Sequence, residues 1–364
     1  MCIHSLKAAF KINIFIKSKP ESYLCVSEFK NKFKSNIKMR CILSTSSNPY
    51  FNLATEEYLL KSTDEEIFLI YINEPCIVVG KHQNLLSEIN LLFTLENKIK
   101  LARRISGGGT VYQDLNNVNF SFIHNITNLE KLNFKKFTNP ILEALREMGL
   151  DVVFSDRNDL LIDSKKISGN AMHIYKTRVL SHGTILYNAN LNILSAALKN
   201  SPQKYIDKSI KSVRSKVTNI WNYLELKKSI DDFENWLFQI IISNMANPIT
   251  KQITKQEMVS IDLICKSKYE TWDWIYAYSP KYVFRNEINL PNKSITFEIH
   301  VEKGVIKNVI TNINSAQNAE YQYIFNTLPD LKHEYKSILE YIKKDPEINS
   351  NQSINLPVFC RYLF

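Results

Sequence analysis

The chain has 364 residues, of which 45% are hydrophobic, and a formal net charge of +10 at pH 7. This is enough sequence for the core of two domains, or of one large domain with an appendage. No apolar run approaches the eighteen residues that a membrane span needs, and the lysines are scattered rather than clustered as in nucleic-acid-binding segments. We therefore expect no nucleic-acid partner and no membrane span, while the positive charge favours an acidic partner.

Residues 1–38 are predicted to be a targeting extension. Residues 1–20 contain no acid, and lysines alternate there with apolar residues. This composition is typical of a mitochondrial presequence, although it is poor in arginine, and Lys11 interrupts the apolar stretch that a secretory signal would need. The alternative is a disordered basic tail. We expect a mitochondrial location.

Glycine is rare and unevenly placed. The chain has 8 glycines, whereas average usage would give roughly 25. Gly149 is expected to end a helix, and Gly304 is expected to form the turn of a hairpin. The other six lie between residues 76 and 188, and this region is where we expect the chemistry.

Hydrophobic periodicity predicts a mixture of short strands and helices from residue 39 to residue 250. The strands are expected at 67–72, 76–79, 99–103, 120–123, 151–154, 160–162 and 179–187, and the helices at 85–97, 137–148, 191–198 and 233–245. This mixture predicts an α+β domain over residues 39–250.

A second, smaller unit is predicted for residues 260–364. The polar segment 247–255 lacks an apolar period and is expected to be a linker. After it come a Trp-x-Trp pair, a hairpin over residues 295–312 and a helix over residues 335–342. This unit is also expected to be α+β.

The six cysteines contain no C-x-x-C pair, which argues against a zinc site. Cys76 is the cysteine nearest to the glycine-rich motifs. Because Cys76 lies in an apolar strand, we favour a packing role for it.

The glycine triplet of residues 107–109 follows a strand and an arginine, Arg104. Glycines leave backbone N–H groups unshielded, so such a loop can wrap an anion, and arginine supplies a charge suited to phosphate. Three further motifs follow, and each could be purely structural when taken alone. They are Arg157-Asn158-Asp159, the run from Lys165 through Lys166 to Gly169, and His182-Gly183-Thr184. Together they supply the cationic, acidic and backbone groups of acyl-phosphate chemistry.

The ordered motifs resemble the lipoate-protein ligase family, which is related to biotin ligases and to lipoyl or octanoyl transferases. The resemblance begins at Met39 and includes residues 48–57, 80–84, 103–112, 157–160, 166–171, 182–184 and 212–217. It implies a biotin/lipoate ligase-like catalytic domain with mixed sheets and a small C-terminal accessory domain. One departure is Ser181, where the family often has a histidine before His182.

The resemblance also implies roles for individual residues. Lys166 aligns with the family's active-site lysine, which contacts both the lipoyl carbonyl and the α-phosphate. The positions implied for nucleotide or lipoyl-AMP binding are Arg104, Gly109, Thr110, Val111, Tyr112, Asp159, Lys166 and His182. Those implied for lipoate are Gly80, His82, Ser106, Gly107, Gly108 and Lys166. Asp159 is expected either to bind Mg²⁺ or to orient Lys166.

The implied reaction uses ATP, Mg²⁺ and lipoate, and transfers the lipoyl group to a lysine of a lipoyl-domain protein. Expected acceptors are the glycine cleavage H protein and the E2 subunits of 2-oxoacid dehydrogenases. Two other functions stay open. An amidotransferase would accept preformed lipoyl-AMP without making it, and a basic scaffold protein would keep the fold without catalysis. No base for the transfer step is evident from the residues.

Overall fold

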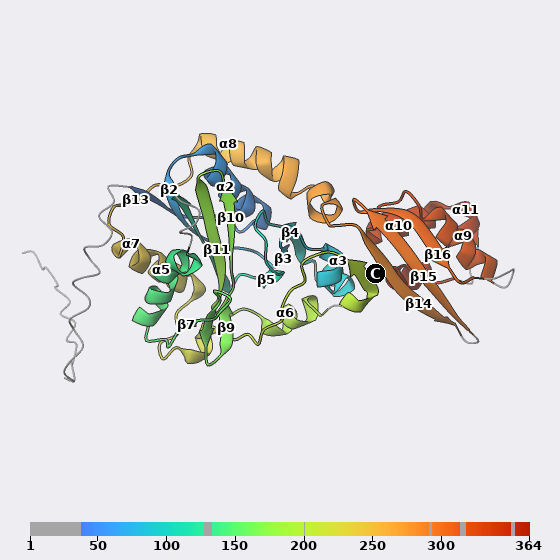
Figure 1. Ribbon diagram of the computed structural model, residues 1–364, viewed down its shortest axis with the longest axis horizontal. Coiled ribbons are helices and arrows are strands. Elements are labelled where there is room, and N and C mark those ends of the chain that lie inside the picture. Colours follow the sequence, from blue (N-terminus) through green and yellow to red (C-terminus); the bar gives the residue numbers. More distant parts are fainter. Residues whose placement is uncertain (1–37, 127–132, 200, 291–292, 314–317, 351–353) are drawn as a thin grey trace, which may run out of the picture. The chain divides into compact units, whose positions relative to one another are not determined.

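The computed structural model describes residues 38–126, 133–199, 201–290, 293–313, 318–350 and 354–364 (Figure 1). The described residues belong to one unit, residues 37–364. The predicted targeting extension lies outside the described residues, apart from Lys38. Among the described helices, none has both the length and the apolar character that crossing a membrane requires.

A six-stranded mixed sheet forms the centre of the larger part of the fold. Its strand order is β10-β11-β6-β2-β1-β13. Strand β1 runs parallel to both of its neighbours, and the other pairs are antiparallel. The strands are β1 (Met39–Leu43), β2 (Glu66–Ile72), β6 (Asn117–Asn125), β10 (Asn170–Tyr175), β11 (Arg178–Leu186) and β13 (Pro248–Thr250).

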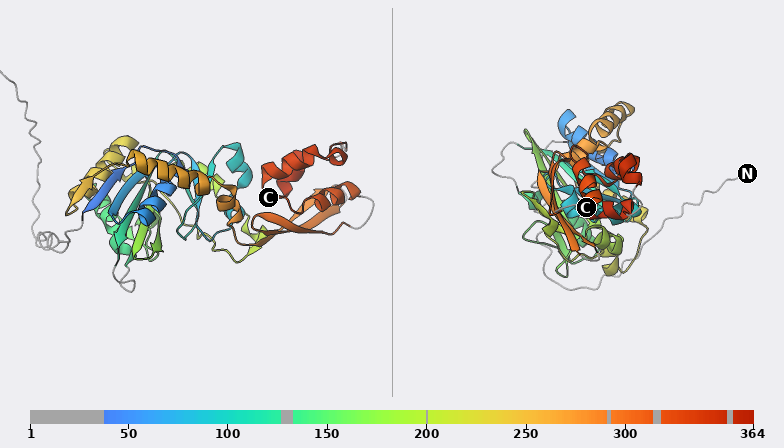
Figure 2. Two further views of the ribbon diagram at one scale, coloured as in Figure 1. Left: turned by 90° about the horizontal axis from the view of Figure 1, so that it is seen from above. Right: turned by 90° about the vertical axis from the view of Figure 1, so that its right-hand side faces the viewer.

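Helices cover both faces of this sheet because its central strands are apolar on both sides. In β2, Phe68 and Ile70 pack against α5 (Phe134–Glu147) and α7 (Ile230–Ser243). The alternate residues of β2 pack with α2 (Pro49–Ser62) and α8 (Lys255–Ile264). Figures 1 and 2 show α8, in orange, beside the blue α2. A strand buried on both faces reads as a continuous apolar run, as residues 67–72 do.

Two three-stranded sheets lie next to the functional site. One has the order β4-β3-β5 and the other β7-β8-β9. Their strands are β3 (Cys76–Val79), β4 (Lys100–Arg103), β5 (Val111–Gln113), β7 (Val153–Phe154), β8 (Leu160–Ile162) and β9 (Lys165–Ser168). Short helices flank them: α3 (Leu85–Glu88), α4 (Leu91–Glu96) and α6 (Leu191–Ala197).

The C-terminal part is an antiparallel four-stranded sheet of order β12-β14-β15-β16, with four helices. The strands are β12 (Tyr205–Asp207), β14 (Tyr282–Leu290), β15 (Lys293–Glu302) and β16 (Val305–Thr311). The helices are α9 (Ala319–Thr327), α10 (Tyr335–Lys344), α11 (Pro346–Ser350) and α12 (Leu356–Tyr362). The edge strand β12 comes from residues that precede α7 in the chain, so this sheet joins two distant segments.

The α+β class and both glycine predictions are confirmed. Gly149 has φ +85° and follows Met148, the C-cap of α5, and Gly304 has φ +69° in the turn between β15 and β16. The predicted helix over residues 85–97 is instead two short helices, because the backbone is extended at Ile89 and Asn90 starts α4 as its N-cap by accepting from Phe93 N at 3.2 Å.

The polar segment 247–255 is not simply a linker. Its residues Pro248–Thr250 form β13 and pair with β1 at the edge of the central sheet. All three side chains are exposed, so the strand is held by backbone bonds at an edge and carries no apolar period. The linker prediction rests on polar composition and on the missing apolar period, and an exposed edge strand has both of these features.

Candidate active site

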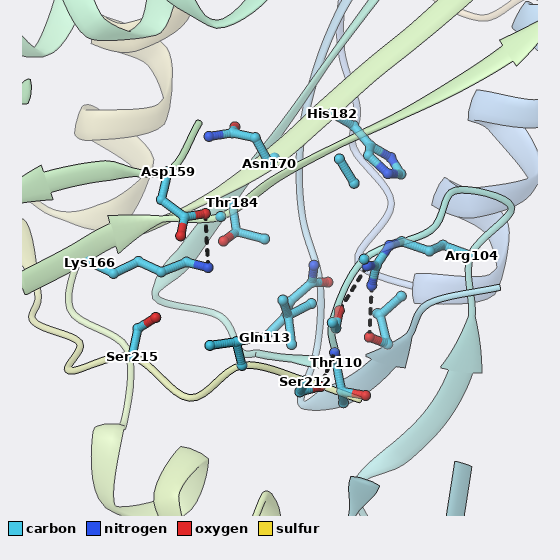
Figure 3. Close-up of a pocket in the computed structure, with 18 of the residues that line it drawn as sticks. Arg104, Thr110, Gln113, Asp159, Lys166, Asn170, His182, Thr184, Ser212 and Ser215 are labelled. Atoms are coloured by element: carbon cyan, nitrogen blue, oxygen red, sulfur yellow. Dashed lines mark hydrogen bonds and ion pairs between the residues drawn. The ribbon is translucent and has the colours of Figure 1, made fainter. Parts of the chain in front are cut away.

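A cavity of about 330 Å³ opens where the central sheet meets the glycine loop. Its walls come from β10 and β11, from β9 with the turn before β8, from the glycine loop and from residues 210–215. Figure 3 shows Lys166 and Asp159 on one side of the labelled residues, and Arg104 and His182 on the other. The cavity thus has one end with an ion pair and another with a buried arginine and histidine.

Lys166 is held at the cavity by its backbone and by its charge. Its N–H donates to the carbonyl of Lys216 at 2.8 Å, and its carbonyl accepts from Thr218 N at 3.0 Å. Its Nζ lies 3.0 Å from Asp159 Oδ1. A Cβ on Gly169 would lie 2.9 Å from Lys166 Nζ, so the missing side chain leaves the room that the ammonium group occupies. The ammonium group is therefore positioned by its surroundings and remains accessible from the cavity.

Arg104 organises the glycine loop from beneath. Its Nε donates to Ser106 Oγ at 3.0 Å, and Nη1 donates to the carbonyl of Val78 at 3.1 Å. Nη2 donates to the carbonyls of Gly107 at 2.6 Å and Gly109 at 2.8 Å. Burial lowers the pKa of Arg104 to about 10, so it stays charged at neutral pH. These donors satisfy loop carbonyls, and the loop bends around the guanidinium group.

The glycine loop also packs against the end of β3. A Cβ on Gly80 would lie 2.1 Å from the carbonyl oxygen of Gly108. No side chain fits at this distance, so the two loops can touch only through glycine. Gly80 thus supports the loop from behind and does not itself line the cavity.

His182 belongs to a buried hydrogen-bond chain. Its Nδ1 lies 2.9 Å from Glu56 Oε2, and its Nε2 lies 2.6 Å from Ser106 Oγ. Glu56 also accepts hydrogen bonds from Tyr71 at 3.0 Å and from Ser121. Burial alone would raise the pKa of Glu56, but the charge and hydrogen bonds of His182 and the bonds from Ser121 and Tyr71 lower it. Because a carboxylate only accepts, the Nδ1 atom of His182 carries the hydrogen that it donates to Glu56.

A second buried arginine, Arg103, joins the site to the segment that precedes β14. Its guanidinium group donates to the carbonyl of Ile275 at 2.8 Å and to Ser279 Oγ at 2.9 Å. It also donates to the carbonyls of Gly80 at 3.0 Å and Gln83 at 2.8 Å. Burial lowers the pKa of Arg103 to about 10. The two consecutive arginines therefore have different structural roles. Arg104 binds the carbonyls of the glycine loop, and Arg103 binds the segment that precedes β14.

The structure brings most of the expected site residues to the cavity. Those that line it are Arg104, Gly108, Gly109, Thr110, Val111, Asp159, Lys166 and His182. Gly80, His82, Ser106, Gly107 and Tyr112 do not line it. Ser106 is buried beneath His182, and His82 is exposed. Tyr112 packs in a hydrophobic core, because alternate residues of β5 point to opposite faces and Val111 takes the cavity face.

Several residues at the site did not stand out in the sequence. Glu56 and Gln83 lay within matching motifs but had no distinguishing spacing, and Lys211, which lines the cavity from a loop, lay outside the motifs. Only the fold brings these side chains together. A signal was available for Glu56, since a glutamate that shares a helix face with Leu53, Leu59 and Leu60 needs a buried partner.

The described residues contain no group of three or more His, Cys, Asp or Glu side chains able to hold a metal ion by themselves. Asp159 is the acidic residue among those that line the cavity. Cys76 is fully buried, and burial raises the pKa of its thiol. A thiol kept protonated in a core is a poor nucleophile, which supports a packing role.

Comparison with known proteins identifies relatives of this chain. Residues 48–242 match the family of lipoyl protein ligase A/B catalytic domains. A lipoate-protein ligase of Bacillus subtilis is 40% identical over 265 residues, which cover 72% of this chain and 80% of that protein.

Solved structures of lipoate-protein ligases are also similar. A ligase from Thermoplasma acidophilum with bound lipoic acid has a TM-score of 0.56 and 27% identity, and the match covers 66% of this chain and 100% of that one. Another similar structure comes from an analysis of a bi-partite lipoate-protein ligase of Thermoplasma acidophilum and its E2 lipoyl domain. A lipoate-protein ligase A bound with ATP has a TM-score of 0.57 and 26% identity, over 66% of this chain and 99% of that chain.

Proposed function

Because the chain belongs to the lipoyl protein ligase A/B family, we propose that it activates lipoate with ATP and transfers the lipoyl group to a lysine of an acceptor protein. The family membership expected from the ordered motifs is confirmed. The single observation that carries the proposal is the ion pair of Lys166 and Asp159 in a cavity walled by the glycine loop. Similar proteins have been solved with lipoic acid and with ATP, which supports these two substrates.

In the first step a lipoate carboxylate oxygen attacks the α-phosphorus of ATP. A new oxygen–phosphorus bond forms, and pyrophosphate leaves with the electrons of the broken bond. Two anions must approach each other, and charge develops on the phosphate oxygens in the transition state. The ammonium group of Lys166 is placed to stabilise this charge, and such fixed cations act more strongly on the transition state than on the separated reactants.

In the second step the ε-amine of the acceptor lysine attacks the acyl carbon of lipoyl-AMP. The bond between the acyl carbon and the phosphate oxygen breaks, AMP leaves, and the amine loses a proton as the amide forms. Lys166 again faces developing charge, now on the acyl oxygen and on the departing phosphate. One positioned cation can therefore serve both steps.

Magnesium fits this site only with help from the nucleotide. Mg²⁺ is commonly held by one or two carboxylates together with phosphate oxygens and water, and Asp159 offers one carboxylate. Its Oδ1 is engaged by Lys166, which leaves Oδ2 as the candidate ligand. Bound magnesium would neutralise the leaving pyrophosphate.

An Asp159→Asn variant separates the two roles of this residue. A raised Mg²⁺ requirement indicates a ligand, and an unchanged requirement with reduced rate indicates that Asp159 orients Lys166.

The acceptors that we propose are lipoyl-domain proteins, namely E2 subunits of 2-oxoacid dehydrogenases and the glycine cleavage H protein. The archaeal ligase studied with its E2 lipoyl domain supports the first of these. The net charge of +10 suits acceptors that are acidic. We further propose that the protein acts in mitochondria, on the basis of the acid-free, lysine-containing residues 1–20.

The decisive experiment measures lipoate-dependent exchange of labelled pyrophosphate into ATP, followed by lipoylation of an isolated E2 lipoyl domain. Both activities are expected. An amidotransferase would show no exchange but would transfer the acyl group from preformed lipoyl-AMP. A scaffold protein would show neither activity and would not bind lipoate in a direct titration.

A further inference from the structure

The orientation of the buried Gln83 side chain is fixed by two backbone groups. Gln83 is fully buried, and its Oε1 lies 2.9 Å from Gly80 N, which can only donate. Its Nε2 lies 3.3 Å from the carbonyl oxygen of Ile210, which can only accept. The amide oxygen and nitrogen are therefore assigned without ambiguity.

This amide determines the roles of two hydroxyl groups at the cavity. Thr110 Oγ1 lies 2.9 Å from the Gln83 oxygen and must donate its hydrogen to it. Ser212 Oγ lies 3.0 Å from the Gln83 nitrogen and must accept. The backbone N–H of Thr110 also donates to Ser212 Oγ, at 2.9 Å (Figure 3). Two donors thus occupy the Ser212 oxygen.

A hydroxyl oxygen that accepts two hydrogen bonds can use its own hydrogen only as a donor. Within the described part of the chain, no acceptor takes the hydrogen of Ser212. Ser212 lines the cavity together with Gly109, where an added Cβ would lie 3.1 Å from Ser212 Oγ. The glycine loop and the 210–215 loop are thus in close contact, and the free hydrogen of Ser212 is available to a bound molecule.

The cavity favours an anionic acceptor for this hydrogen. Lys166 and Arg157 both line it, and Asp159 is the acid among the lining residues. A phosphate oxygen carries negative charge and no hydrogen, so it accepts strongly from a fixed donor. A lipoate carboxylate shares this chemistry, and the measurements below distinguish the two sources.

We propose that Ser212 is a preset hydrogen-bond donor to a phosphate oxygen of the nucleotide, and that Gln83 is the positioning residue that turns the Ser212 hydrogen toward the cavity. This inference rests on the proposed ATP-dependent activation. It adds a contact that neither the glycine loop nor Lys166 provides. The donor is prepared before the nucleotide arrives, so its use costs no reorganisation.

Ser212→Val and Ser212→Thr form a matched pair, because the two side chains have nearly the same shape and only threonine keeps the hydroxyl. In the pyrophosphate exchange reaction, Ser212→Val is expected to lower kcat/KM for ATP by about ten- to a hundredfold, as for the loss of a hydrogen bond to a charged group. Ser212→Thr is expected to restore most of this loss. Thermal unfolding and a Ser260→Val control on the exposed face of α8 report any general effect on folding.

Gln83→Glu tests the positioning role with an almost isosteric change. The carboxylate turns an acceptor toward Ser212, which then donates to residue 83 instead of to the cavity. We expect a loss similar to that of Ser212→Val, and the double variant should lose little more than either single variant. A multiplicative loss in the double variant would show that Gln83 does not act through Ser212.

The titrations identify the bound group. In Ser212→Val, weaker binding of MgATP with unchanged binding of lipoate is the expected result. Weaker binding of lipoate alone would overturn the assignment to phosphate. Normal exchange in Ser212→Val, with exchange abolished in Lys166→Ala, would overturn the role of Ser212 and leave the proposed function standing. Absence of exchange in the unmodified protein would instead refute the proposed function.

Discussion

The Nζ atom of Lys166 lies 3.0 Å from Oδ1 of Asp159. Lys166 lies on β9, and Asp159 directly precedes the antiparallel neighbouring strand β8. The side chains are 25% and 16% exposed, respectively. The pair is thus shielded from bulk water, where its interaction would be weak, yet it remains open to the cavity. An arriving anion can take the place of the aspartate without moving the lysine far.

Replacing Lys166 with alanine is expected to abolish adenylate formation while the protein stays folded. The variant loses the ammonium group that bridges the carboxylate and the phosphate, a contact worth about 3 kcal/mol or more, which corresponds to a rate loss of at least roughly a hundredfold. Pyrophosphate exchange measures the effect, and circular dichroism checks the fold. Lys165→Ala is the matched control, because Lys165 is exposed at the start of β9. Near-normal exchange in Lys166→Ala would place the catalytic charge elsewhere.

Gly80→Ala is expected to disturb the glycine loop from outside the cavity. Its Cβ would lie 2.1 Å from the carbonyl oxygen of Gly108, so one of the two loops must move. Overpacking of this kind costs about 1–3 kcal/mol. We expect a lower unfolding temperature and weaker lipoate binding.

Gly107→Ala is the control for this prediction. An added Cβ at Gly107 meets nothing within 4 Å, and its φ is not positive. The change in unfolding free energy is expected to stay within about 0.5 kcal/mol. Equal destabilisation by the two variants would contradict the close contact of Gly80 with Gly108.

Apolar runs and glycine positions were sufficient to predict much of the fold. The strand over residues 76–79 and the hairpin turn at Gly304 are where the sequence placed them, because burial on both faces and a positive φ leave direct traces in residue type. The edge strand β13 has no recognisable pattern of residue types, because it is held by backbone pairing with β1 and its side chains are exposed.

The sequence predicted the site as a set of motifs. The contacts that each side chain makes could be identified only from the fold. The sequence identified Arg104 as a charge near the glycine loop, but not that its donors are taken up by loop carbonyls. It placed Gln83 in a motif, but the hydrogen bonds of Gln83 join residues 80, 110 and 212. Partners this far apart in the chain cannot be read from spacing.

The stability of the protein should depend on pH through Glu257. The hydrogen bonds from Arg40, at 2.7 and 2.9 Å, are the main cause that lowers the pKa of Glu257 to about 2. In the unfolded chain a glutamate has a pKa of about 4.3. Because the folded pKa is the lower one, this contribution is fully present above about pH 4.3 and is lost as the pH falls toward 2.

We therefore expect Glu257→Gln to lower the unfolding temperature at neutral pH, with a difference from the unmodified protein that disappears between about pH 4.3 and 2. Glutamine can still accept at the Oε2 position from Thr254 N and Arg40 Nη2, but its NH2 group would face Arg40 Nη1, so the variant removes the charge together with one hydrogen bond. Glu65→Gln is a useful comparison, since Glu65 is 43% exposed and should contribute less. A difference that persists unchanged at pH 2 would contradict the assignment.

The last prediction concerns residues 1–38. Strand β1 begins at Met39 and pairs with both β2 and β13, so a chain that starts at Met39 keeps every described strand. We expect this shortened protein to fold and to ligate lipoate like the complete chain in a purified system. In cells the complete chain should reach mitochondria, and the shortened chain should not. Replacing Lys7, Lys11, Lys17 and Lys19 with glutamate should block import without changing activity in the purified system, because a presequence follows the membrane potential with its positive charge. If the intact protein stays in the cytosol, the targeting role is wrong. If the chain that starts at Met39 is inactive, this segment contributes to folding or to recognition of the acceptor.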